Sequence, residues 1–181
     1  MKKIIIFLVT LSMVVGCACQ TDKASDAVKE YLTKYNNQDE KVLTGLEDII
    51  KEENLSEEQG EKYKEVMTKQ YKDLSYKITN EMYNGDEATV TTKITVYDLY
   101  NAQKEAEEYQ NNNRREFIDE DGNYDKDKFL DYKLEQMKKT TKTIEYTIDF
   151  PVIKKDGKWT LENISTETLE KIHGIYNYTN D

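Results

Sequence analysis

The sequence predicts an α+β fold, with a curved antiparallel sheet of about four strands packed against helices from the first half of the chain. Two observations lead to this fold class. Between residues 24 and 74, apolar side chains recur every three or four positions, which is the spacing of amphipathic helices. Farther along, two pairs of segments alternate apolar and polar residues on either side of a glycine-containing turn, as antiparallel hairpins do.

Three amphipathic helices are expected first. The opening apolar stripe covers residues 24–35, and a second, shorter stripe covers residues 42–50. A third helix begins at Ser56, because Ser56-Glu57-Glu58-Gln59 has the pattern of a capping box, and residues 63–74 line its apolar face. Since none of these helices can bury its stripe alone, they are expected to pack around the sheet.

The strands are expected to form two hairpins. In the first hairpin, residues 76–82 and 88–96 alternate around Asn84-Gly85, and Met82 is among the side chains expected to face inward. The second hairpin joins residues 144–152 to a short strand that contains Trp159 and Leu161. Asp156-Gly157 supplies its turn.

A helical insertion separates the two hairpins. Residues 99–118 have helical spacing that turns Tyr109 inward, and after an acidic loop another helix covers residues 129–137. A closing helix that contains Leu169 and Ile172 follows the second hairpin. The chain beyond residue 23 is therefore expected to form one domain, residues 24–181.

The first seventeen residues have the features of an export signal. Lys2 and Lys3 precede an apolar run over residues 4–15, which is shorter than the roughly 20 residues that span a bilayer. The run ends in Val14-Val15-Gly16-Cys17, which resembles the lipobox of bacterial lipoproteins. This resemblance implies cleavage before Cys17 and a diacylglyceryl thioether on its sulfur. In the alternative, an ordinary secretory signal is cut elsewhere and Cys17 is incidental.

The predicted domain organisation follows from that signal. Residues 1–16 are a lipoprotein signal peptide, residues 17–23 are a lipidated tether, and residues 24–181 are the folded domain. The expected location is the cell membrane of a bacterium, with the protein lipid-anchored on the extracytoplasmic face. The membrane, contacted through the lipid on Cys17, is its first expected partner.

The chain resembles small extracytoplasmic lipoproteins of low-GC bacteria that carry an NTF2-like (cystatin-like α+β) domain. The features that carry this resemblance are the anchored Cys17, the amphipathic opener at residues 28–35, and the terminal strand pair joined by Lys155-Asp156-Gly157. The resemblance implies a pocket between sheet and helices that binds small ligands. The helical insertion between the hairpins is a departure from the simplest members of the family.

Composition excludes several classes of function. The formal net charge is −10, and removal of Lys2 and Lys3 takes it to −12, so nucleic acid is not an expected partner. The negative charge instead favours binding of cationic ligands, metal ions and basic peptides. With one histidine and two cysteines, of which Cys17 is acylated, a His/Cys metal cluster is excluded.

No catalytic signature is present. The seven glycines form no phosphate-binding loop, and there is no zinc-protease or serine-hydrolase motif. His173 has no nucleophile near it in sequence and is expected to be structural or superficial. Asp149 alternates onto the strand face opposite Tyr146, which argues against an isomerase-like pair of aspartate and tyrosine. The protein is therefore expected to be no enzyme and to use no cofactor.

An acidic loop is the one candidate metal site. Oxygen-bearing side chains recur there at every second position, a spacing that suits a hard cation such as calcium. They are Asp119, Asp121, Asn123, Asp125 and Asp127. The loop departs from an EF-hand, because Tyr124 stands where glycine makes the bend and Leu130 where a bidentate glutamate belongs. In the alternative, Asp121-Gly122-Asn123 forms a turn and Asp125 caps the next helix.

Six tyrosines fall on faces that are expected to point inward. They either pack in the core with their hydroxyls at its rim, or line an aromatic pocket between sheet and helices. They are Tyr31, Tyr35, Tyr63, Tyr71, Tyr76 and Tyr146.

Three functions follow from these observations. The leading hypothesis is a noncatalytic binding or interaction module that is tethered to the envelope, with a small ligand, a peptide or an envelope component as its partner. A small pocket enzyme of isomerase or hydrolase type is the second. A structural or immunity-type surface lipoprotein is the third.

Overall fold

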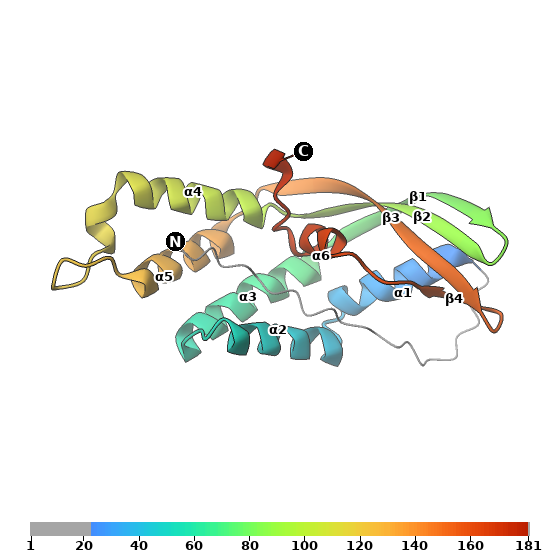
Figure 1. Ribbon diagram of the computed structural model, residues 1–181, viewed down its shortest axis with the longest axis horizontal. Coiled ribbons are helices and arrows are strands. Elements are labelled where there is room, and N and C mark those ends of the chain that lie inside the picture. The colour runs from blue at the N-terminus through green and yellow to red at the C-terminus, as the bar shows by residue number, and fades with distance from the viewer. Residues whose placement is uncertain (1–22, 181) are drawn as a thin grey trace.

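The computed structural model describes residues 23–180 as an elongated α+β domain with six α-helices and a four-stranded antiparallel sheet (Figure 1). The predicted fold class is confirmed at this level. In chain order the elements are α1 (Ala24–Asn36), α2 (Glu40–Glu52), α3 (Glu57–Asp73), β1 (Ser75–Asn84), β2 (Glu87–Tyr97), α4 (Leu99–Asn112), the 3-10 helix η1 (Arg114–Phe117), α5 (Lys126–Lys139), β3 (Thr143–Lys155), β4 (Lys158–Leu161), α6 (Thr166–His173) and the 3-10 helix η2 (Tyr178–Asn180).

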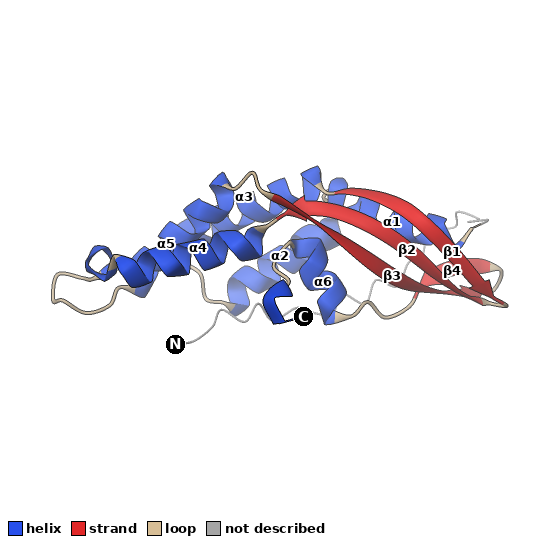
Figure 2. Ribbon diagram, turned by 90° about the horizontal axis from the view of Figure 1, so that it is seen from above, coloured by secondary structure: helices blue, strands red, loops and turns tan. Residues whose placement is uncertain are grey.

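The sheet is an antiparallel meander with strand order β1-β2-β3-β4. It curves around α1, which lies across its concave face (Figure 2). Val90 and Ile94 on β2 and Phe150 on β3 are fully buried on this face, and the Phe150 ring meets the ring of Tyr31 from α1 edge to face at 6.3 Å. The alternating patterns therefore predicted both hairpins and the inner face of β2 and β3.

The prediction that Met82 faces inward is wrong. The pairing of β1 with β2 shifts between Ile78 and Asn80, which marks a β-bulge. An extra residue reverses the alternation of side chains, so Glu81 and the partly exposed Tyr83 lie on the side of α1, and Met82 lies on the other side and is 59% exposed.

The start of α1 is capped from the sheet. Lys23 provides no side-chain cap. Instead, the Ser25 amide donates to Oε2 of Glu81 at 3.1 Å and the Ala24 amide donates to the hydroxyl of Tyr83 at 3.3 Å. These bonds satisfy two of the free amides that every helix has at its N-terminus. The bulge in β1 thus positions the two side chains that fix the first helix.

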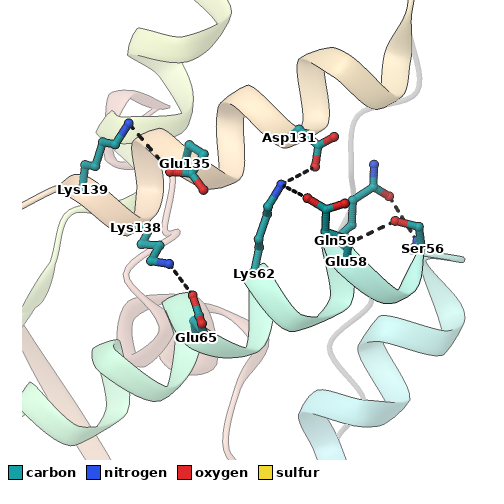
Figure 3. Close-up of polar contacts among 9 residues, drawn as sticks. All are labelled: Ser56, Glu58, Gln59, Lys62, Glu65, Asp131, Glu135, Lys138 and Lys139. Atoms are coloured by element: carbon teal, nitrogen blue, oxygen red, sulfur yellow. Dashed lines mark hydrogen bonds and ion pairs between the residues drawn. The ribbon is translucent and has the colours of Figure 1, made fainter.

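The predicted capping box of α3 is confirmed. Oγ of Ser56 accepts from the Gln59 amide, and the Gln59 side chain accepts from the Ser56 amide (Figure 3). At the other end of α3, Gln70 is fully buried. Its amide group accepts from Tyr97 N and donates to the carbonyls of Tyr97 and Ile172, so it joins α3 to β2 and α6.

Helices α4 and α5, with η1 and the loop between them, form an arm that projects from the rest of the molecule (Figures 1 and 2). Two predictions for this insertion are wrong in detail. The helix expected over residues 99–118 ends at Asn112 and continues as η1, and Tyr109 is 37% exposed instead of inward. Tyr109 lies beyond the main core, where it stacks on Tyr132 of α5 at 5.0 Å.

The predicted signal peptide, residues 1–16, and the tether with Cys17 lie outside the described residues and stay predictions. Within the described range, no helix combines the length and the apolar character needed to cross a bilayer.

Candidate functional site

A cleft of about 340 Å³ lies between α2 on one side and α1, α3 and α6 on the other. This volume is at the lower end of the range of small-molecule sites. The cleft is lined by Tyr35, Glu40, Lys41, Val42, Thr44, Gly45, Leu46, Asp48, Ile49, Tyr71, Leu169 and His173.

The cleft exists because α2 covers the other helices with a narrow face. Only Val42, Leu46 and Ile49 of α2 are buried. Gly45 lies among them, and a Cβ atom placed there would have no neighbour within 4 Å. A helix with larger side chains at this point would fill the space. The sequence of α2 therefore leaves a hollow where a tighter helix would close the core.

Three rings form the inner wall. Tyr35 from α1 meets Tyr71 from α3 edge to face at 5.0 Å, and Tyr71 lies 5.5 Å from the imidazole of His173 on α6. The Tyr35 hydroxyl shares a hydrogen bond with the Tyr31 hydroxyl at 3.1 Å. Three segments that are far apart in the sequence thus contribute one aromatic surface.

Burial keeps this wall uncharged. It lowers the pKa of His173 to about 4, so the imidazole is neutral near neutral pH. Burial also raises the pKa of Tyr35 to about 12. Nδ1 of His173 is buried and has no hydrogen-bond partner among the described residues. The inner wall is therefore apolar in bulk, with phenol and imidazole groups as its polar elements.

The outer wall of the cleft is polar and charged. Glu40, Lys41, Thr44 and Asp48 of α2 line the cleft on its outer side, and Asp48 forms an ion pair with Lys51 at 3.7 Å. An apolar wall that faces a polar, charged one suits an amphipathic small molecule, because each part of such a molecule would meet a surface of its own kind.

A second, smaller cavity of about 30 Å³ lies between α3 and α5. Tyr63 and Lys133 contribute to its lining, and the Tyr63 hydroxyl has no hydrogen-bond partner among the described residues. Burial lowers the pKa of Lys133. This cavity is far smaller than the roughly 300 Å³ of the smallest small-molecule pockets, so it has room for water but not for a ligand of that kind.

The six tyrosines that were predicted to face inward do not gather at one site. Five are buried and Tyr76 is half-buried, so the inward faces were predicted correctly. Only Tyr35 and Tyr71 line the larger cleft, which lies among helices and not between sheet and helices. Asp149 is exposed on the outer face of β3, opposite Tyr146, as its position in the strand predicted.

His173 was expected to be structural or superficial, and no pattern in the sequence links it to a cleft. Its place in the wall depends on how α6 packs against α1 and α3, and this tertiary arrangement has no local sequence signal.

The acidic loop forms a turn and a helix cap. Oδ1 of Asp119 accepts from the amides of Asp121 and Asn123, at 3.0 and 2.7 Å, and Gly122 has a φ of +83°. Asp125 caps α5 by accepting from the Lys128 amide at 2.9 Å. These observations confirm the helix cap that the alternative to a calcium site predicts, and they place a turn with a left-handed glycine in the loop.

The calcium candidate stays a prediction. Within residues 23–180, no group of three or more histidine, cysteine, aspartate or glutamate side chains is arranged to hold a metal ion. The five residues proposed as ligands, Asp119, Asp121, Asn123, Asp125 and Asp127, therefore form no assembled cation site.

Comparison of the chain with known protein families, with curated proteins and with solved structures finds no match.

Proposed function

We propose that this protein is a membrane-anchored extracytoplasmic lipoprotein whose NTF2-like domain acts as a noncatalytic binding module for a small, largely apolar molecule. The single observation that carries the binding function is the cleft of about 340 Å³ with its inner wall of Tyr35, Tyr71 and His173. The lipobox-like Val14-Val15-Gly16-Cys17 supports the anchor.

Size and charge restrict the ligand. A cleft of this volume lies at the lower end of the range for small-molecule pockets, so it suits a small ligand. The inner wall carries no charge near neutral pH, because burial keeps His173 neutral. A ring or short hydrocarbon with one polar group matches this environment, since burial of a full charge against it would be costly.

A ligand screen tests the proposal. The chain from residue 18 onward retains the whole described domain and lacks only the lipid-bearing Cys17 of the proposed mature protein. Small aromatic and aliphatic alcohols, ketones and amides would be screened by thermal shift, with binders confirmed by calorimetry. A ligand at one hundred times its dissociation constant stabilises the fold by about 2.7 kcal/mol, which gives a shift of several degrees. Failure of the whole screen at millimolar concentration contradicts the proposal.

A variant of α2 shows whether binders occupy the cleft. Gly45→Leu places a side chain in the open space beside Val42 and Leu46, so binding should be lost while the domain stays folded. Glu52→Leu adds the same side chain at the exposed end of the same helix and should leave binding unchanged. Equal effects of the two variants would place the ligand elsewhere.

A small pocket enzyme of isomerase or hydrolase type is the second candidate. The observation in its favour is that two carboxylates, from Glu40 and Asp48, share the cleft with the phenols of Tyr35 and Tyr71. A carboxylate base and a phenol donor are a common pair for proton transfer. If a bound compound is converted, Asp48→Asn should abolish the conversion and keep the binding, whereas a binding module returns its ligand unchanged.

A further inference from the structure

The end of the arm exposes an apolar patch. In the described part of the chain five large hydrophobic side chains are exposed, and three of them lie here: Tyr109 (37%), Ile118 (40%) and Tyr124 (47%). Single exposed apolar residues are normal on a protein surface, but several that lie on one projection are typical of a surface that binds a partner.

The patch is held in a fixed arrangement. Behind it, the buried ring of Phe117 contacts Phe129 and Tyr132 at 5.5 and 5.4 Å, and Tyr109 stacks on Tyr132. Ile118 and Tyr124 pair as a short antiparallel bridge across the loop. Because these rings are already ordered, a partner would lose little conformational entropy in binding them.

The arm is also fixed to the body. Lys62 of α3 reaches Asp131 of α5 at 3.1 Å and Glu58 of its own helix at 2.8 Å, and Lys138 of α5 pairs with Glu65 of α3 (Figure 3). Leu134 and Met137 of α5 are buried in the main core. The patch therefore has a defined position relative to the rest of the domain.

Charge identifies the kind of partner. We define the arm end as residues 107–128, which contain eight carboxylates and four basic side chains, a net charge of −4. This short segment carries four of the ten net negative charges of the chain. A second copy, itself at −12 without Lys2 and Lys3, and an anionic lipid surface would both be repelled. A basic polypeptide would be attracted, and exposed tyrosine rings add cation–π contacts with arginine and lysine.

We propose that the arm end is a docking surface for an arginine- or lysine-rich segment of another protein. Its apolar contacts come from Tyr109, Ile118 and Tyr124, and its charge contacts come from the surrounding carboxylates. This surface is separate from the cleft, so the proposal does not depend on the ligand of the cleft.

The arm end lies far from the start of α1. Helix α1 begins beside the β1–β2 turn, where Tyr83 caps it, and the loop that follows η1 lies at the opposite end of the long axis (Figure 1). With Cys17 anchored as in the proposed function, the arm end is therefore at the end of the domain opposite the attachment.

A peptide titration tests the proposal on the chain from residue 18 onward. The probe is a ten-residue peptide of alternating arginine and alanine, and its counterpart has glutamate in place of arginine. We expect saturable, salt-sensitive binding of the arginine peptide alone, with amide shifts in nuclear magnetic resonance spectra confined to the arm end. Absence of binding at millimolar peptide, or shifts spread evenly over the acidic surface, overturns the proposal.

Matched variants separate the patch from general acidity. The combination Tyr124→Ser, Glu120→Lys and Asp121→Lys changes exposed residues of the arm end and should weaken binding at least tenfold. The combination Met82→Ser, Asp86→Lys and Glu87→Lys makes the same kinds of change at the β1–β2 turn and should leave binding unchanged. Equal losses in both overturn the proposal.

Two further measurements test whether a second copy of the chain, or the membrane, binds the arm end instead. Sedimentation of the protein should show a monomer, and flotation with phosphatidylglycerol vesicles should show no binding by the unlipidated chain. A dimer that Tyr124→Ser dissolves, or vesicle binding that this variant abolishes, would assign the patch to a second copy or to the membrane and overturn the proposed partner.

Discussion

At the scale of single residues, Gly174 occupies a position with no room for a side chain. It ends α6 with a φ of +71°, in the left-handed region that favours glycine. A Cβ atom there would lie 2.2 Å from the Tyr97 carbonyl oxygen and 2.4 Å from Nε2 of Gln70. The buried Gln70 network therefore depends on the absence of one carbon atom.

Gly174→Ala should lower the free energy of unfolding by about 3 kcal/mol, because it adds steric overlap to an unfavourable φ. Gly157→Ala is the control, since Gly157 has a φ of +78° and nothing within 4 Å of a Cβ atom. This control should cost about 1 kcal/mol. Urea denaturation of both variants measures the difference, and equal losses would show that crowding at Gly174 has no effect.

His173 makes stability depend on pH. Its pKa is lowered by burial from 6.5 to about 4, so the unfolded chain binds more protons than the native chain between these values. Stability is therefore lost as pH falls from about 6.5 towards 4. Between pH 7 and pH 5 the expected loss is about 2 kcal/mol.

His173→Phe keeps a ring in the cleft wall and removes the titration, so its stability should not show this loss. Glu170 on the same helix has a raised pKa, first because it is buried and second because Glu167 is near. A raised carboxyl pKa increases stability as the pH falls, so the contribution of Glu170 has the opposite sign to that of His173. That contribution is common to both proteins and cancels in their difference. Parallel pH dependence in urea denaturation of the two proteins would contradict the assignment.

At the scale of elements, α2 contains a helix-breaking residue in its middle. Gly45→Ala should raise the free energy of unfolding by about 1 kcal/mol, because alanine is the better helix former and its Cβ meets open space. Gly60→Ala in α3 is the control, since its Cβ would lie 2.9 Å from Cγ2 of Ile50 and crowd the contact with α2. A smaller gain or a net loss is expected there. Thermal denaturation compares the two.

Some of these elements could be predicted from the sequence and others could not. Capping at Ser56 and the turns at Gly85 and Gly157 depend on residues close together in the chain, so local patterns were sufficient. The bulge near Thr79 has no such pattern, and it alone reversed the side of Met82. The cleft depends on how α2 and α6 pack, so Tyr35 and Tyr71 could be predicted as buried rings, whereas the cavity and the place of His173 in its wall could not.

At the scale of the whole molecule, the arm and the body differ in how they are supported. The amides of β2 and β3 lie within the sheet over the main core, whereas the arm end is covered only by its own aromatic cluster. Hydrogen exchange should therefore be faster for residues 107–128 than for β2 and β3, because local opening there exposes little apolar surface. Equal protection, measured by mass spectrometry, would show that arm and body open together.

The first turn of α1 receives two of its hydrogen bonds from the sheet, because Glu81 and Tyr83 accept from the amides of Ser25 and Ala24. A chain from residue 18 onward retains both donors and both acceptors. Exchange of the proposed lipid anchor for another attachment should therefore leave this cap in place, and the domain could be displayed on a different surface with its first helix still fixed to the sheet.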